Sequence, residues 1–364
     1  MNLQYYILQI SKKKIKIDSI VNLELNLHCK NDSHIKSLSE EFSGKKAKIF
    51  ETINLKLISY SALTAYIYGC SSILEKLIGS DGSLSIIATG LTIFTVILFL
   101  FDTHIISKIN NIAFIISIAL FFTIILRILT CTDFSNIPLT CNISFHAIST
   151  TLSVIFLSLS YQIIFYAIRD YCNNDINMIK KAYLWGSIVP MIVYTLWTCG
   201  SLSIIYNKNI GFFNSIDNNT DVGGFIEELS KHLQFSKLQV LVYVISVFTI
   251  FTSIIGVGLG LKKNISNILN IENKKKCNIM STLITILPPY IVSIIIPNAF
   301  IMLLKFASFF LINISIFLPA YLYFKANIKQ PYIKILNKQL LIFCVFIGIV
   351  ILSSPFFSFC KLIF

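Results

Sequence analysis

The stretch FLSLSYQIIFYAIRD, residues 156–170, combines the two features that decide the fold. Most of it belongs to a longer run, 147–168, that has no charged side chain. A run of roughly 20 apolar residues is what a helix needs to cross the hydrocarbon core of a bilayer. Near the middle of this run, Ser158, Ser160, Tyr161 and Gln162 stand close together. We therefore expect a membrane-spanning helix with polar side chains at the bilayer midplane.

The rest of the chain repeats the apolar pattern. Hydrophobic residues make up 55% of the 364 and charged residues only 13%, and the mean hydropathy is +0.76, whereas a soluble domain is about one quarter charged. The runs do not alternate apolar and polar as barrel strands do. The sequence therefore predicts an all-α polytopic membrane protein. Nine transmembrane helices are expected, at 50–74, 84–103, 112–130, 147–168, 184–206, 238–261, 279–296, 299–324 and 339–360.

The basic residues predict the orientation of these helices, because connections rich in Lys and Arg stay in the cytoplasm. One alternate set of connections holds 13 of these residues, and the other holds 5. The basic segment 1–48 joins the richer set, and we expect it to be cytoplasmic and not membrane-spanning, with the transmembrane domain at 49–364. An odd number of spans then leaves the C-terminus in the periplasm. The net charge of +13 is thus a topological signal and not evidence for nucleic-acid binding.

Motifs for enzyme chemistry are missing from the sequence. It has no DxD, HExxH, GxSxG or Walker-type loop, so a multipass membrane enzyme is the weakest interpretation. The nine cysteines lack metal-ligand spacing, and we expect neither a metal site nor a cofactor. The longest external connection, 207–237, is predicted to carry a short surface helix at about 224–233. The ionisable residues nearest the membrane are Asp102, His104, Arg127 and Lys305.

Two interpretations of the polar stretch at 156–162 remain open. On a helix, Ser158, Tyr161 and Gln162 share one face, and Thr151 and Tyr166 extend it. Such side chains can join helices through hydrogen bonds worth typically about 0.6 kcal/mol each. Alternatively, the helix is interrupted here, and side chains and free backbone groups bind a solute, as in transporters built from inverted repeats.

Three pairs of stretches, in order along the chain, resemble the aromatic amino acid permeases, the bacterial tyrosine and tryptophan permease family. The first pair is NLELNLHCKNDSHIKSLSEEFSGKKAKI (22–49) and YSALTAYIYGCSSIL (60–74). The second is FLSLSYQ (156–162) and MIKKAYLWGSIVPMIVYTLW (178–197). The third is FTSIIGVGLGL (251–261) and LPPYIVSIIIPNAFIMLLKFAS (287–308). Together they span nearly the whole chain from residue 22.

The resemblance implies a leucine-transporter-like fold of inverted repeats, with eleven helices of which the first and sixth are broken near the midplane. The nine spans correspond to family helices three to eleven, so the fold is expected to be truncated at the N-terminus and to lack the first two helices. FLSLSYQ falls in the sixth helix. Two family residues differ there, because Ser160 replaces a glycine and Gln162 a histidine.

By the same resemblance, the chain is a permease that imports aromatic amino acids such as tyrosine or tryptophan across the bacterial inner membrane, with protons as the expected coupling ion. The substrate would meet Ser158, Ser160, Tyr161 and Gln162, with Tyr60 and Thr64 opposite. Thr252 and Ser253 would lie near the ion site. The alternative is an inactive, truncated remnant with a structural role only. Gly256 and Gly260 form a GxxxG pair, which most often permits close helix packing.

Overall fold

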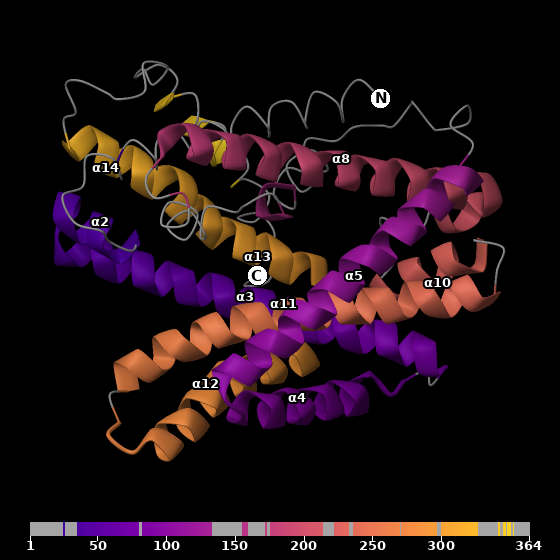
Figure 1. Cartoon of the computed structure of the whole chain (residues 1–364), viewed down its shortest axis with the longest axis horizontal. Helices are drawn as coiled ribbons and strands as arrows, with labels where there is room; N and C mark the ends of the chain where they lie inside the picture. The colour runs from indigo at the N-terminus through magenta and orange to yellow at the C-terminus, as the bar shows by residue number, and fades with distance from the viewer. Residues whose placement is uncertain are drawn as a thin grey trace. The chain divides into compact units, whose positions relative to one another are not determined.

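The computed structural model describes residues 25, 35–79, 82–132, 155–158, 172, 175–213, 222–232, 236–269, 271–296 and 300–326, with short pieces between 341 and 352. These residues form helices, with no strand among them (Figure 1). The helices are α2 (Ile35–Ser43), α3 (Lys45–Ile78), α4 (Leu84–Leu100), α5 (Thr103–Cys131), α8 (Ile176–Lys208), α10 (Val222–His232), α11 (Ser236–Leu269), α12 (Lys274–Ile295), α13 (Phe300–Ile312), the π-helix η3 (Asn313–Phe317) and α14 (Leu318–Ala326).

Among the described residues, six helical segments are long and apolar enough to cross a membrane. They are Lys45–Ile78, His104–Cys131, Asn177–Lys208, Val240–Leu269, Lys274–Ile295 and Met302–Ala326, and Leu84–Leu100 is a shorter apolar helix. The prediction of an all-helical membrane protein is therefore confirmed. The expected spans 147–168 and 339–360 fall mostly outside the described residues, so the count of nine and the leucine-transporter-like fold stay predictions.

Two helices extend past the apolar runs from which they were predicted, whereas α4 ends at Leu100, before the predicted end of its span at 103. The run at 50–74 lies inside α3, which begins at Lys45, and the run at 184–206 lies inside α8, which begins at Ile176. Hydropathy marks only the part of a helix that sits in hydrocarbon, whereas the backbone hydrogen bonds continue into the polar flanks. The predicted surface helix is also present, as α10.

The chain divides into two compact units, and three of the four divisions fall inside α3, α8 and α13; the fourth, at 140/141, lies outside the described residues. The first unit comprises residues 1–58, 141–194 and 304–364. A buried cluster in it brings Phe156 together with residues of α13 and η3, namely Leu311, Ile312, Ile314 and Ile316, and with Ile58 of α3. At the α2–α3 corner, Gly44 has a φ of +82°, a conformation that favours glycine.

The second unit comprises residues 59–140 and 195–303. In it, α12 returns beside α11 after a short connection (Figure 1), and α3 and α4 pack against both. The residues at the centre of this packing are buried: Leu63, Ile67 and Cys70 of α3, Ala88 and Phe99 of α4, Ile254, Ile255 and Leu261 of α11, and Ile286 of α12.

The glycine that permits close packing of α11 differs from the predicted pair. A Cβ atom built on Gly258 would lie 2.6 Å from Cζ of Phe99, whereas one built on Gly256 or Gly260 would meet no atom within 4 Å. The GxxxG prediction was therefore wrong about which glycines matter. The spacing of two glycines defines a face of α11, but the position of α4 decides which face is in contact.

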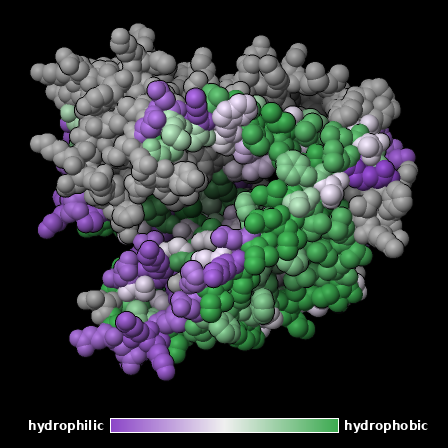
Figure 2. Space-filling view, in the orientation of Figure 1, coloured by the Kyte–Doolittle hydropathy of each residue, from purple (hydrophilic) through white to green (hydrophobic). Residues whose placement is uncertain are grey.

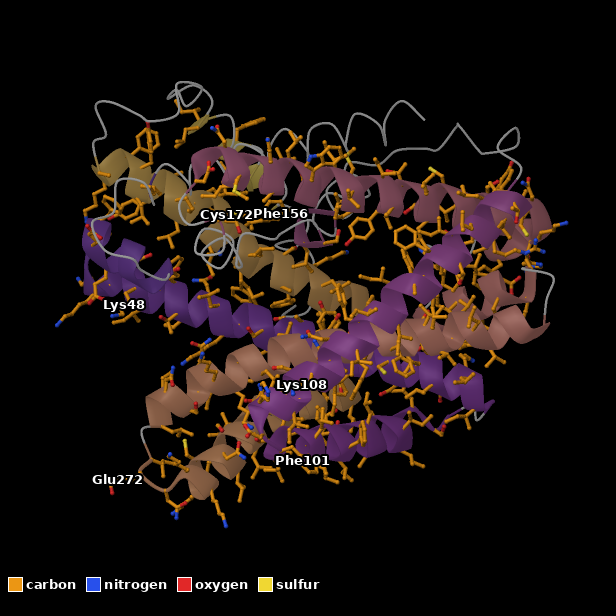
Figure 3. The ribbon with its side chains drawn as sticks, viewed as in Figure 1. Lys48, Phe101, Lys108, Phe156, Cys172 and Glu272 are labelled. Atoms are coloured by element: carbon orange, nitrogen blue, oxygen red, sulfur yellow. The ribbon has the colours of Figure 1, made fainter. Side chains whose placement is uncertain are left out.

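Large apolar side chains cover much of the visible surface over α4 and α5 (Figure 2). Hydrophilic side chains gather instead where α11 ends and α12 begins (Figure 2), at Lys263, Lys274, Lys275 and Lys276. Glu272 points away from the helices in this connection (Figure 3). This distribution is typical of helices in contact with lipid that end in polar connections.

Candidate substrate-binding site

Ser158 lies in a short helical piece, residues 155–158, of the first unit. Phe156 is 1% exposed and anchors this piece in the buried cluster, whereas Ser158 is exposed. The hydroxyl of Ser158 donates to the carbonyl of Ile155 at 3.0 Å, and the hydroxyl of Tyr194 on α8 reaches the Ser158 carbonyl at 3.5 Å. The other three members of the polar stretch, Ser160, Tyr161 and Gln162, lie outside the described residues, so the predicted interruption of this helix stays a prediction.

Tyr60 lies on α3 and forms a contact with α12 that sequence reasoning did not foresee. Its hydroxyl donates to the carbonyl of Ile284 at 2.9 Å. In an α-helix that carbonyl would accept from the N–H of the residue four positions later, but this residue is Pro288, which has no N–H. Tyr60 therefore satisfies a backbone acceptor that the proline leaves open. Its hydroxyl joins two helices, and its side chain is half-buried against the apolar cluster of α3, α4 and α11.

Thr64 and the predicted ion-coupling residues all bond to their own helices. The Thr64 hydroxyl donates to the carbonyl of Tyr60 at 2.8 Å. On α11, Thr252 and Ser253 both donate to the carbonyl of Thr249, at 2.9 Å and 3.0 Å. A hydroxyl that donates in this way still has lone pairs with which to accept. Thr64 and Thr252 are buried, and Ser253 is partly exposed.

A π-helical turn near the middle of the 299–324 span was missed. In η3 the N–H of Leu318 donates to the carbonyl of Asn313, five residues earlier. Pro319 follows and has no N–H to offer, which gives a physical reason for the irregular turn. Ser315 in this turn is 2% exposed, and its hydroxyl has no hydrogen-bond partner in the part of the chain that the structure describes. The signal was present, since Asn313, Ser315 and Pro319 interrupt an apolar run.

This π-helical turn packs against the start of the candidate polar stretch. Ile314 and Ile316 belong to the same buried cluster as Phe156. Single π-turns inside α-helices frequently occur at functional sites. The first unit therefore contains a buried hydroxyl that has no partner among the described residues, that of Ser315, in a turn whose two flanking isoleucines pack in one cluster with Phe156.

Lys262 was predicted to lie in a connection between spans, and this placement was wrong, whereas the side of the membrane on which it lies stays a prediction. It lies within α11 and is 6% exposed, whereas Lys263 beside it is exposed. Its ammonium group donates to the carbonyl of Phe99, and Asn278 of α12 donates to the carbonyl of Leu100 at 3.1 Å. These are the last residues of α4, where helix carbonyls lack intrahelical donors and favour a positive charge. The apolar pattern of α11 does not indicate a contact between Lys262 and Phe99, because Phe99 lies on another helix.

The described residues thus offer hydroxyl groups, an aromatic ring and backbone carbonyls, and they contain no cluster of His, Cys, Asp or Glu that could hold a metal ion. Hydroxyls can donate hydrogen bonds to a polar solute and accept them from it, and carbonyls can accept them. Tyr60, Thr64, Thr252 and Ser253 belong to the second unit, and Ser158 and Ser315 belong to the first.

Comparison with known proteins adds independent information. The sequence profile of the tryptophan/tyrosine permease family matches residues 7–355. Tyrosine-specific transport system 1 of Haemophilus influenzae is 25% identical over 94% of this chain and 86% of its own length. Tyrosine-specific transport system 2 of the same organism is 22% identical over 89% of this chain and 81% of its own length. The tryptophan-specific transport protein of Shigella flexneri is 22% identical over 79% of this chain and 70% of its own length.

Proposed function

Because the chain belongs to the tryptophan/tyrosine permease family, we propose that it imports an aromatic amino acid, tyrosine or tryptophan, across the bacterial inner membrane by proton symport. The observation that carries this proposal is the family match over residues 7–355, together with relatives named for tyrosine and tryptophan transport. The six long apolar helices are consistent with a permease that spans the membrane several times. The process is transport by alternating access and involves no bond chemistry.

In this proposal the polar stretch binds the charged groups of the amino acid. Hydroxyls of Ser158, Ser160 and Tyr161 and the amide of Gln162 can donate to its carboxylate, and free carbonyls at an interrupted helix can accept from its ammonium group. The buried hydroxyl of Ser315, without a partner among the described residues, supports the assignment, because it lies in the turn that packs against the start of this stretch.

Tyr60 and Thr64 would form an apolar wall for the aromatic ring of the substrate. The hydroxyl of Tyr60 donates to the Ile284 carbonyl. Tyr60 would therefore contribute to substrate binding through packing of its ring, which favours edge-to-face or offset contacts. Thr252 and Ser253 would serve the coupling ion, with the lone pairs that their bonds to Thr249 leave available.

The second candidate function is that of a structural remnant that does not transport. It is favoured by the replacement of the family glycine by Ser160 and of the family histidine by Gln162. Serine accepts an irregular backbone less readily than glycine, and an amide cannot carry a proton as an imidazole can.

Uptake of radiolabelled tyrosine by proteoliposomes that contain the purified chain separates the two functions. We expect accumulation driven by an inward proton gradient, competition by unlabelled tryptophan but not by lysine, and loss of accumulation with an uncoupler. Gln162→Ala should raise the KM about tenfold, since a hydrogen bond to a charged group is worth about 1.5 kcal/mol. Asn267→Ala, an exposed amide at the end of α11, is the matched control. A folded chain that takes up none of the aromatic amino acids would reject transport.

A further inference from the structure

The short helix α10 closes one end of the second unit. Its apolar residues Ile226 and Leu229 are buried among the terminal turns of four longer helices. The partners are Ile73 near the end of α3, Ile124 and Ile128 near the end of α5, Ile204 and Ile205 near the end of α8, and Val242 near the start of α11. Movement of α10 away from this position would expose the ends of all four helices.

The first turn of α10 is fixed to α3 by backbone contact. The N–H of Gly223 donates to the hydroxyl of Ser72 at 3.2 Å. A Cβ atom at Gly223 would lie 2.6 Å from the carbonyl oxygen of Ser72, so only glycine fits. This attachment contains no titratable group, and we expect it to be independent of pH.

The last turn of α10 is fixed to α8 through a carboxylate. Glu228 is 8% exposed, and its Oε1 atom accepts from Nδ2 of Asn209 at 2.6 Å. The same oxygen lies 3.0 Å from Nε2 of His232, one turn later. Asn209 directly follows the end of α8 and also accepts from the N–H of Phe212 at 3.0 Å. The carboxylate therefore joins the imidazole of α10 to the end of α8.

Other charged groups surround this carboxylate at longer distances. Lys231 lies 2.7 Å from Glu227 and 3.8 Å from Glu228, and Lys76 of α3 lies 4.0 Å from Glu227. The titratable or charged residues at the helix ends packed against α10 are Glu75 and Lys76 on α3, Arg127 and Cys131 on α5, Tyr206 and Lys208 on α8, and Lys237 and Tyr243 on α11. Among these groups and those of α10 itself, His232 carries the one imidazole, the side-chain type that proteins use most often as a proton switch near neutral pH.

We propose that Glu228 and His232 form a proton-binding site that fastens α10 to the end of α8 and holds it more tightly as the surrounding pH falls from 8 to 5.5. A protonated imidazole adds a positive charge to a hydrogen bond that already ends on a carboxylate, and such charge-assisted bonds are roughly twice as strong as neutral ones. The site requires no part of the predicted substrate site.

The carboxylate keeps its charge over this pH range. Burial raises the pKa of Glu228, but the hydrogen bonds from Asn209 and His232 and the charge of Lys231 outweigh burial, so its pKa is lower than usual. A lowered carboxyl pKa means that stability is lost only as the pH falls through the folded-state value, which is below the ordinary carboxyl range. Between pH 5.5 and 8 the carboxylate of Glu228 is therefore not the group that takes up the proton.

Hydrogen–deuterium exchange of the purified full chain tests the site directly. After correction for intrinsic exchange rates, the amides of α10 should be about fivefold more protected at pH 5.5 than at pH 8, the factor that a gain of about 1 kcal/mol gives. His232→Asn should remove this dependence, and Glu228→Gln, which keeps the shape of the side chain, should remove it as well. The amides near Gly223 should change least.

His104→Asn is the matched control, because His104 is exposed on α5 and distant in sequence from the α10 site. It should retain the pH dependence of the unmodified chain. The proposal would be overturned if the protection of α10 in the unmodified chain did not change with pH. It would also be overturned if the protection changed with pH as much in the His232 and Glu228 variants as in the unmodified chain.

Transport adds a second readout, which alone rests on the proposed function. We expect α10 to move away from the helix ends that it covers more slowly when it is held tightly. Exchange of tyrosine across proteoliposomes at equal pH on both sides should therefore speed up from pH 5.5 to 8, and His232→Asn should flatten this rise. A chain that carries no tyrosine would reject the proposed function but leave the hydrogen-exchange result unaffected, so the two can fail separately.

Discussion

At the scale of single residues, Ser315 has a hydroxyl that is buried without a hydrogen-bond partner in the described structure. Such a group costs about 1–3 kcal/mol, so Ser315→Ala should increase the free energy of unfolding in mixed micelles. If the hydroxyl contacts the substrate, the same change should raise the KM for tyrosine. Ser308→Ala, in the same span but with its hydroxyl bonded to the carbonyl of Lys305 at 2.6 Å, should not stabilise. A Ser315→Ala variant that is less stable would contradict this interpretation.

Gly258 gives the second prediction at this scale. A Cβ atom at Gly258 would lie 2.6 Å from Cζ of Phe99, whose side chain is fully buried. Gly258→Ala should lower the free energy of unfolding by about 1–3 kcal/mol through overpacking. Gly256→Ala, on the open face of the same helix, should be neutral or slightly stabilising, because alanine favours a helix over glycine. Equal effects of the two substitutions would show that α4 does not pack at Gly258.

At the scale of elements, the contact between α3 and α12 depends on a proline. Tyr60→Phe leaves the carbonyl of Ile284 without a donor, because Pro288 cannot supply one. We expect the substitution to lower the free energy of unfolding by about 1 kcal/mol. In a Pro288→Ala background, the new N–H can bond to this carbonyl within α12. The cost of Tyr60→Phe should then fall towards zero.

A double-mutant cycle in mixed micelles measures this coupling. Thr64→Val is the control, because Thr64 bonds to its own helix, and its effect should be the same with and without the Pro288→Ala substitution. A cost of Tyr60→Phe that is unchanged in the Pro288→Ala background would mean that the tyrosine hydroxyl does not act through the open carbonyl.

The presence of each long apolar helix could be predicted from the sequence, but its contacts with other helices could not. Hydropathy summed over about 20 residues predicts a span, and it located α3, α5, α8, α11 and α12. The resemblance of six short stretches predicts the tryptophan/tyrosine permease family, and the family profile confirms it. The partner of Tyr60, the burial of Lys262 and the packing of Gly258 each depend on a neighbouring helix distant in sequence. No pattern within one helix contains that information.

At the scale of the whole molecule, the charge distribution still favours a cytoplasmic N-terminus. Removal of the buried Lys262 from the cytoplasmic count leaves the difference between the two sets of connections large. The lysines at 263 and 274–276 remain exposed at one end of α11 and α12. Positive residues near the ends of spans determine the orientation of those spans. Each span that is present reverses the side of the membrane on which the following residues lie, so the predicted spans 147–168 and 339–360 can be tested by locating the residues on both sides of them.

Reporter fusions on each side of those spans test both the orientation and the count of nine. Alkaline phosphatase is active only in the periplasm, and it should be active when fused after residue 140 or 364 but inactive after residue 175 or 332. Green fluorescent protein should give the reverse pattern, since it does not fluoresce after export in an unfolded state. A fusion after residue 272, in the connection rich in lysine, is the cytoplasmic control. The same reporter response at 140 and 175 would remove the span at 147–168, and with it the midplane position on which the binding roles of Ser158, Ser160, Tyr161 and Gln162 depend.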